Sequence, residues 1–334
     1  MTTVYITHND TTLSKLGDRI IVRQDGKEVA DLPVIKVDQI VIFGNASLSA
    51  QLITMLLDAG IPVTYLTFNG RFRGRLLPHV SKNSLLRKEQ FRASLDKNTC
   101  CYLAASFVKG KLTNMRNFIL RNTRGERTDQ TNEACGKIKM MIDKLPFTKN
   151  MDEIRGIEGM GTKYYFKEFA KLLNDEKGMT FTHRNKRPPR DPVNALLSFC
   201  YVMLYNEIQT ALYIVGFDPY IGYLHADKYG KPSLALDLME EFRAPVADSL
   251  VVSLINKGMV AKENFKENEI GAIEMTESTL KKVVQSFEKK LRSRIKYSLL
   301  EETITMREIM EKQARILGKY LTGEIDHYPP YTLR

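Results

Sequence analysis

The sequence predicts an α+β protein in which a small, β-rich N-terminal domain precedes a larger, mostly α-helical domain. Short runs of β-branched and aromatic residues, separated by turn residues, occupy about the first 75 residues. From about residue 84 onward, the apolar residues recur at helical spacing instead. The 334 residues are enough for two domains, each with its own core. We therefore expect domains at residues 1–80 and 84–334.

The N-terminal elements are predicted from turn residues and from strand-type runs. Asp25 and Gly26 separate two such runs and are typical of a tight β-hairpin. Residues 34–43 and 61–66 are further β-rich runs. Between these two runs, Ser47 is a candidate N-cap for a short apolar helix that ends before Gly60.

The helical domain is predicted to contain a long central helix. Residues 193–215 are largely apolar, and Asp191 with Pro192 before them matches an N-cap followed by proline at the first helical position. Ser233 is a candidate N-cap for a shorter helix that continues until Pro245. Two later amphipathic patterns predict helices at residues 280–291 and 306–317.

The charge balance favours a polyanionic partner. The chain has 50 Lys and Arg against 39 Asp and Glu, for a formal net charge of +11. Basic residues gather at residues 82–121, which include Lys111, on the helix face of residues 163–171, and at residues 183–190. Each run alone is more typical of a solvated face than of a binding site, but three such runs in one helical domain, together with the net charge, favour binding. The candidate contacts to nucleic-acid phosphates in the last run are Arg184, Lys186, Arg187 and Arg190.

The sequence has no run of apolar residues long enough for a membrane span, and its N-terminus does not resemble a secretory signal. Its four cysteines form no CxxC pair and have no metal-ligand spacing to a histidine. We therefore expect a cytoplasmic protein, without membrane association, whose thiols are reduced.

Residues 222–243 (GYLHADKYGKPSLALDLMEEFR) place His225, Asp237 and Glu240 in a stretch that is otherwise typical of a buried segment. Asp237 and Glu240 share one helix face, where like charges oppose each other. A positive partner is therefore expected. One candidate is Arg243, in an ordinary intrahelical ion pair. The other is a divalent cation, which accepts imidazole nitrogen and carboxylate oxygen together.

A second unusual stretch is RGIEGMGTKYYF, residues 155–166. It places Glu158 between Gly156 and Gly159, and such small neighbours let a ligand or another backbone approach a carboxylate closely. The alternative is that Glu158 caps a helix that begins near Thr162 and whose positive end attracts an acidic side chain. The stretch alone leaves both interpretations open.

Taken together, GIEG, GYLHAD and SLALDLMEEFR resemble the CRISPR-associated protein 1 family, the integrases of CRISPR adaptation. The resemblance covers the whole chain, and RDPVNALLSFCYVMLYNEI matches the long helix of that family. It implies that Glu158, His225 and Glu240 bind one catalytic metal ion. It also implies that Asp237 is a catalytic-site acid that either orients His225 or the metal water, or binds the metal directly. Asn194 and Tyr201 are expected to shape the site.

The resemblance further implies an activity. The protein would be a metal-dependent DNA endonuclease and integrase that inserts short foreign DNA fragments, called spacers, into a CRISPR array by 3′-hydroxyl attack on a phosphodiester. The implied cofactor is Mg²⁺ or Mn²⁺, held in the helical domain at residues 84–334. The implied partners are double-stranded DNA, a second copy joined through residues 1–80, and a dimer of CRISPR-associated protein 2. A type I system is expected.

Two other functions agree with part of the sequence. A basic nucleic-acid-binding protein without enzymatic activity would explain the charge, but it leaves Asp237 and Glu240 beside His225 without a purpose. A zinc hydrolase would usually carry a close histidine pair such as HExxH, which the five histidines do not form.

Overall fold

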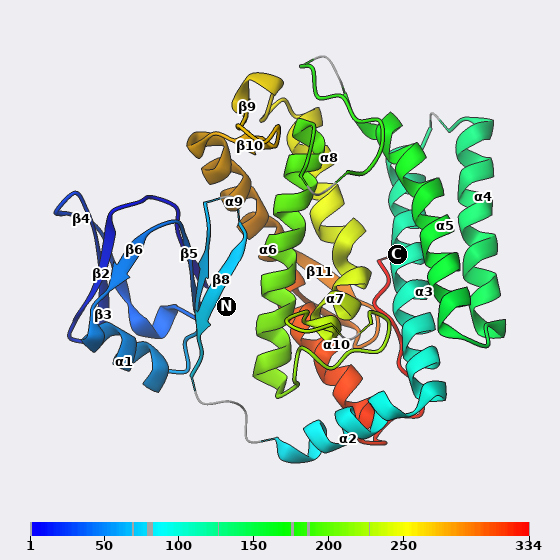
Figure 1. Cartoon of the computed structure of the whole chain (residues 1–334), viewed down its shortest axis with the longest axis horizontal. Helices are drawn as coiled ribbons and strands as arrows, with labels where there is room; N and C mark the ends of the chain where they lie inside the picture. Colours follow the sequence, from blue (N-terminus) through cyan, green and yellow to red (C-terminus); the bar gives the residue numbers. More distant parts are fainter. Residues whose placement is uncertain are drawn as a thin grey trace. The chain divides into compact units, whose positions relative to one another are not determined.

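Figure 1 shows the computed structural model of the chain, which describes residues 2–333 except 69, 79–82, 126, 175–176, 186–187 and 227. It confirms the predicted fold class, because a β-rich N-terminal part is followed by a mainly helical part. The chain forms two compact units. The first contains Met1–Val80 and Met275–Glu288, and the second contains Ser81–Glu274 and Lys289–Arg334.

Two four-stranded sheets and one helix make up most of the first unit. The sheets have the strand orders β1-β5-β7-β8 and β4-β3-β2-β6. Apolar side chains from both sheets and from α1 (Ala50–Asp58) form one buried core. The strands are β1 (Thr3–Ile6), β2 (Thr11–Leu16), β3 (Arg19–Gln24), β4 (Lys27–Pro33), β5 (Gln39–Phe43), β6 (Ala46–Leu48), β7 (Val63–Leu66) and β8 (Phe72–Leu76).

The predicted hairpin is confirmed, while two neighbouring predictions need correction. Asp25 and Gly26 connect antiparallel β3 and β4, and both have positive φ, as a tight hairpin turn requires. Ser47 is not a helix cap, because Ala46–Leu48 pairs with β2 as a strand. The cap is Ser49, whose hydroxyl accepts a hydrogen bond from the Leu52 backbone N–H at 3.3 Å. Val34–Lys36 forms a 3-10 turn, so the predicted strand of residues 34–43 begins only at Gln39.

The first unit also includes a segment from late in the chain. Met275–Glu288 covers most of α9 (Glu277–Leu291), a helix predicted from its amphipathic pattern. The Tyr5 hydroxyl donates a hydrogen bond to Glu288 at 3.3 Å, and the Glu277 carboxylate lies 2.7 Å from the His8 ring. These contacts explain why the segment groups with residues 1–80, although almost 200 residues separate the two in the sequence.

Long helices dominate the second unit. In Figure 1, α3 (Lys97–Asn122), α4 (Asp129–Lys144) and α5 (Met151–Phe169) lie side by side, in agreement with their contacts. The predicted central helix is α6 (Pro192–Val215), and most of its side chains are buried. Asp191 caps it, as predicted, by accepting a hydrogen bond from the Asn194 backbone N–H at 2.8 Å.

The remaining elements of this part are shorter helices and strands, some of which pack against α6. They are α2 (Ser84–Leu95), α7 (Ser233–Met239), α8 (Ser249–Asn256), β9 (Phe265–Glu267), β10 (Ile273–Met275), β11 (Arg294–Tyr297), β12 (Glu302–Thr305) and α10 (Met306–Leu321). No helix within the described ranges is both long and apolar enough to cross a membrane. The four cysteines all lie among the described residues, and no disulfide joins them.

The chain that follows α10 has no regular secondary structure and lies against α3. The Tyr328 hydroxyl and the Tyr331 backbone N–H each donate a hydrogen bond to the Glu241 carboxylate at 2.7 Å. The Asn114 side chain, on α3, donates to the backbone oxygens of Glu241 and Tyr331 at 2.7 and 2.9 Å. Burial raises the pKa of Glu241 to about 8, although both donors favour its ionised form. This C-terminal tail therefore holds the residue that directly follows Glu240.

We predict that Gly110→Ala destabilises the protein. A Cβ atom at Gly110 would lie 2.9 Å from Glu241 Cγ and 2.9 Å from Pro330 Cβ, so the tail would have to shift. Overpacking of this kind costs roughly 1–3 kcal/mol of unfolding free energy. Denaturant unfolding measures this loss.

Gly136→Ala is the matched control, because Gly136 lies in α4 with no atom near the added methyl group. There the substitution should stabilise the protein by up to about 1 kcal/mol, since alanine is the better helix former. A Gly110→Ala protein as stable as the wild type would contradict the described seating of the tail.

Candidate functional site

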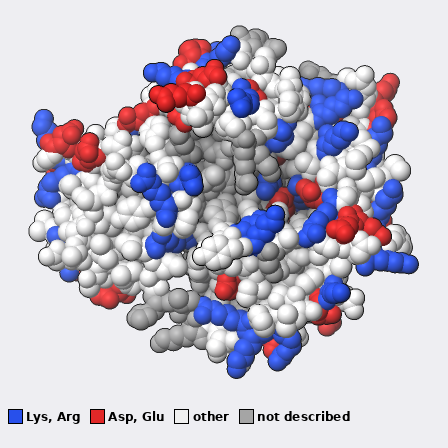
Figure 2. Space-filling model, viewed as in Figure 1, with Lys and Arg blue, Asp and Glu red and all other residues white. Residues whose placement is uncertain are grey.

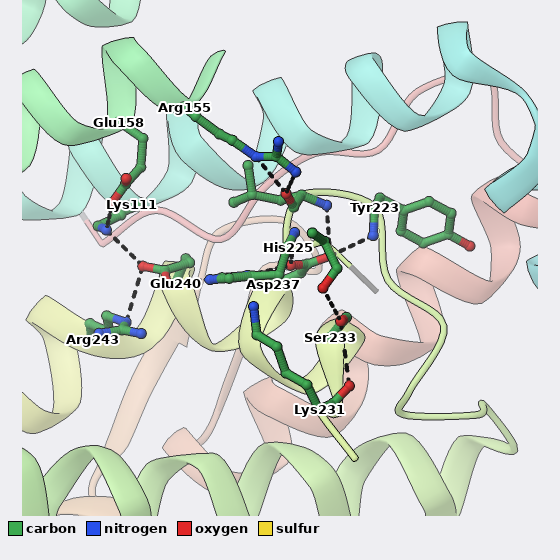
Figure 3. A network of polar contacts seen from close by, with 12 residues as sticks. Lys111, Arg155, Glu158, Tyr223, His225, Lys231, Ser233, Asp237, Glu240 and Arg243 are labelled. Carbon is green, nitrogen blue, oxygen red and sulfur yellow. Dashed lines mark hydrogen bonds and ion pairs between the residues drawn. The ribbon is translucent and has the colours of Figure 1, made fainter. Parts of the chain in front are cut away.

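The predicted metal ligands come from three segments of the second unit. Glu158 lies in the middle of α5, His225 lies in the loop before α7, and Glu240 begins a 3-10 turn directly after α7. The alternative that Glu158 caps a helix near Thr162 is wrong, because α5 already begins at Met151. Figure 3 shows the three side chains within one network of polar contacts.

Asp237 fixes the histidine. Its carboxylate is fully buried and lies 2.6 Å from His225 Nδ1. It also accepts hydrogen bonds from the backbone N–H groups of Tyr223, Leu224 and His225 at 2.6, 2.9 and 3.0 Å. Both carboxylate oxygens are therefore engaged, which favours the orienting role over direct metal binding. The other ring nitrogen, His225 Nε2, remains available and lies 4.0 Å from Glu240 Oε1.

A glycine makes this arrangement possible. A Cβ atom at Gly222 would lie 2.8 Å from Asp237 Oδ2 and 2.6 Å from the Ser233 side chain. The loop backbone can therefore approach Asp237 only without a side chain at this position. Ser233 is not the predicted N-cap, since it is the first residue of α7 and its hydroxyl donates to the Ala226 carbonyl at 3.3 Å.

Lys111, from α3, lies between Glu158 and Glu240 and contacts both carboxylates (Figure 3). Its ammonium nitrogen pairs with Glu158 Oε1 and lies 2.9 Å from Glu240 Oε2. The Lys111 side chain is only 5% exposed, so its assignment to a basic surface run was wrong. The helical period could have indicated that Lys111 is buried. Phe107 and Met115, four residues before and after Lys111, lie on the same face of α3 and are buried.

Glu240 is buried and ionised. The expected contact with Arg243 is present, with Arg243 Nε 3.0 Å from Glu240 Oε2. Burial by itself would raise the pKa of Glu240, but Arg243, Lys111 and His225 outweigh it and lower that pKa to about 2. Glu240 therefore carries its charge throughout the physiological pH range.

The chain around Glu240 departs from the predicted regular helix. Glu240–Phe242 forms a 3-10 turn, and Arg243–Asp248 forms a π-helix that includes Pro245. Proline has no N–H to donate, so the regular helical ladder is interrupted here. Glu240 consequently faces Lys111 and Arg243, whereas the adjacent Glu241 faces the C-terminal tail.

Arg243 is itself held by aromatic and acidic neighbours. Its guanidinium lies over the Tyr201 ring, 4.7 Å from the ring centroid. The hydroxyls of Tyr201 and Tyr165 donate hydrogen bonds to Asp248 at 2.6 and 2.7 Å. Burial raises the pKa of Asp248 to about 6, against the lowering effect of both hydroxyls. Tyr201 was expected near the site, whereas Tyr165 and Asp248 were not. The three residues belong to α5, α6 and the π-helix, and no local sequence pattern shows that these helices meet.

The predicted phosphate contacts differ in their environment. Arg184 is partly buried and donates to Asn194 Oδ1 at 2.6 Å and to the Ser198 hydroxyl at 3.0 Å, and its contact with phosphate stays a prediction. Arg190 is exposed. Lys186 and Arg187 lie outside the described residues. On the face in Figure 2, basic and acidic side chains are interspersed and do not form one continuous basic field.

The donor set fits a hard divalent cation, because two carboxylates and one imidazole nitrogen suit Mg²⁺ and especially Mn²⁺. As the side chains lie, no three His, Cys, Asp or Glu groups in the described part of the chain are close enough to hold a metal. In this arrangement the Lys111 ammonium group lies between Glu158 and Glu240. Negative charge is thus concentrated here and is balanced by side-chain cations.

Known proteins are similar to this chain over almost its whole length. A family model described as "CRISPR associated protein Cas1" matches residues 4–289. The CRISPR-associated endonuclease Cas1 3 of Thermus thermophilus is 39% identical over 333 residues, which are 99% of this chain and 97% of that relative. The CRISPR-associated endonuclease Cas1 1 of Chlorobaculum tepidum is 35% identical, over 100% of this chain and 99% of that relative.

Solved structures share the fold. A CAS1 protein from Thermotoga maritima superposes with a TM-score of 0.83 at 25% identity, over 97% of both chains. A casposase bound to its integration product gives 0.86 at 25% identity, over 100% of this chain and 95% of that one. A chain of a Cas6-RT-Cas1–Cas2 complex gives 0.84 at 21% identity, over 100% of this chain and 36% of that one, and shows the fold alone.

We predict that Asp248 makes stability depend on pH. Its pKa of about 6 lies above the ordinary value of 3.8, so the folded state retains this proton after the unfolded chain has lost it. The resulting stabilisation is complete below about pH 4 and is lost as the pH rises through about 6. Relative to Asp248→Asn, the wild type should therefore lose on the order of 2–3 kcal/mol of unfolding free energy between about pH 4 and pH 7.

Denaturant unfolding of both proteins across this range measures the difference. Asp152→Asn serves as the control, because Asp152 is almost fully exposed and its substitution should leave the profile unchanged. Parallel profiles for the wild type and Asp248→Asn would show that this carboxyl group does not retain its proton on folding.

Proposed function

Because the chain belongs to the CRISPR associated protein Cas1 family, we propose that it is a DNA endonuclease and integrase that inserts short foreign DNA fragments into a CRISPR array in antiviral defence. The likeness to curated Cas1 endonucleases along nearly the full chain supports the nuclease assignment. The likeness to a casposase with its integration product supports DNA joining. In that reaction a 3′-hydroxyl attacks a phosphodiester, a new P–O bond forms, and the former 3′-oxygen leaves.

One Mg²⁺ or Mn²⁺ ion bound by Glu158, His225 and Glu240 is part of this proposal. The observation that supports it most is the orientation of His225: Asp237 binds Nδ1, and Nε2 is left facing Glu240 Oε1 at 4.0 Å. When bound, the ion would polarise the attacked phosphate and stabilise the negative charge that develops on it. This chemistry requires open coordination positions, which three protein ligands leave.

The surrounding residues prepare the ligands. A hydrogen bond from His225 Nδ1–H to the Asp237 carboxylate would orient the ring so that the Nε2 lone pair can bind the ion. Arg243 and Lys111 keep Glu240 ionised despite its burial. The Thr162 hydroxyl donates to Glu158 Oε1 at 3.1 Å and restrains that carboxylate from the next helical turn. Each ligand is thus restrained by a neighbouring group of the chain, as a positioned site requires.

Partners are also part of the proposal. Double-stranded DNA is the expected substrate, and exposed Arg190, together with Lys186 and Arg187, is proposed to contact its phosphates. A homodimer through the N-terminal domain is also proposed, and the first unit carries exposed apolar side chains that such an interface would cover, namely Leu16, Val29 and Ile35. A dimer of the Cas2 protein is the expected further partner, and a type I system remains a prediction.

We predict that Glu158→Ala, His225→Ala and Glu240→Ala each reduce strand transfer into a repeat substrate at least about 100-fold, because a metal ion contributes several kcal/mol to such reactions. DNA affinity should stay within about threefold, since the proposed contacts to the DNA backbone are made by other residues. A chelator should stop the wild-type reaction, and added Mn²⁺ or Mg²⁺ should restore it. Gel assays with a labelled DNA fragment measure the rates.

Asp152→Ala is the matched control on α5, because this side chain is exposed and should leave activity unchanged. Wild-type strand transfer by correctly folded His225→Ala, or full activity in the presence of chelator, would refute the metal assignment.

A further inference from the structure

The ammonium group of Lys111 lies where a cation shared by Glu158 and Glu240 would lie. It pairs with both carboxylates, which belong to different segments of the chain, and its side chain is almost completely buried. A buried lysine is costly unless its charge is paired, so these two contacts define its position. They also account for the fact that the carboxylates and His225 do not converge on one point.

We propose, resting on the metal site of the proposed function, that Lys111 is an internal competitor of the metal ion. In the metal-free protein its ammonium group substitutes for the divalent cation between Glu158 and Glu240. When the metal binds, this group must leave the space, because two cations within a few ångströms repel each other. The affinity of the site for metal is therefore lower than its three ligands alone would give.

Lys111 is the cation that moves, and Arg243 is the one that stays. Arg243 is held over the Tyr201 ring at 4.7 Å and contacts Glu240 at 3.0 Å, so its planar group is fixed on two sides. A lysine side chain has four flexible methylene groups and a single point charge, and it can withdraw by rotation about its own bonds. Removal of its contact also leaves Glu240 paired with Arg243.

The entry side is the Glu158 end of the pair. The Glu158 side chain is 29% exposed, whereas that of Glu240 is 4% exposed. An ion arriving from solvent would therefore reach Glu158 before Glu240 and would displace the ammonium group from Glu158 first; His225, at 27% exposure, is accessible from solvent as well. While Lys111 occupies the space, it also prevents mutual repulsion of the two carboxylates in the metal-free protein.

The test compares Mn²⁺ binding by the wild type, Lys111→Met and Lys109→Met. Binding is measured as loss of the electron paramagnetic resonance signal of free Mn²⁺, which does not depend on enzymatic activity. Lys111→Met should bind Mn²⁺ at least about tenfold more tightly than the wild type. Lys109 lies two residues away on α3 but is exposed, so Lys109→Met should bind as the wild type does.

A second variant, Lys111→Gln, is used in case Lys111→Met does not fold. Lys111→Gln removes the charge but can still donate a hydrogen bond to Glu158, and it should also bind Mn²⁺ more tightly. If the folded Lys111 variants bind Mn²⁺ no more tightly than the wild type does, the proposal is wrong.

His225→Ala, combined with each Lys111 variant, distinguishes an error in the proposed competition by Lys111 from an error in the proposed metal site. Loss of the tight binding in the double variant places the ion at this site and supports the competition. If wild-type binding depends on His225 but does not change at Lys111, the competition is wrong and the metal site stands. If no protein binds Mn²⁺, or if binding is indifferent to His225, both the metal site and the competition are wrong.

Discussion

The negative charge of Glu240, buried in the helical unit, is the constraint on which the site depends. An ionised carboxylate in such a place is unstable unless cations and hydrogen-bond donors surround it. Arg243 and Lys111 supply the positive charge, and together with His225 they lower the pKa of Glu240 to about 2. Burial thereby becomes compatible with a permanent charge, which is what a ligand for a hard cation needs.

Much of the surrounding fold can be understood from this charge. The helix around Glu240 changes from α to 3-10 and then to π, and within it Glu240 and Glu241 point to different partners. The C-terminal tail then binds Glu241 from the other side. Tyr201 supports Arg243, and Asp248 binds the Tyr201 hydroxyl. A chain of contacts from three helices and the tail therefore fixes one carboxylate.

Features that depend on neighbouring residues could be predicted from the sequence. The Asp25–Gly26 hairpin, the Asp191 cap and the amphipathic helices follow from turn chemistry and period, and all three are present. The meeting of Glu158, His225 and Glu240 in one network was inferred only from family motifs. Lys111 was assigned to a basic surface, because composition along the chain does not reveal which lysine faces a buried acid. The Glu241 contacts were missed for the same reason, since they join residues about 90 positions apart.

The central claim is that Glu158, His225 and Glu240 together bind one divalent cation. The most direct measurement is anomalous X-ray diffraction from crystals of the protein soaked in Mn²⁺. We expect a single strong peak within bonding distance of both carboxylates and of His225 Nε2, with the Lys111 ammonium group moved out of the space between Glu158 and Glu240. A peak at another place, or an empty site in which Lys111 still joins the two carboxylates at saturating Mn²⁺, would contradict it.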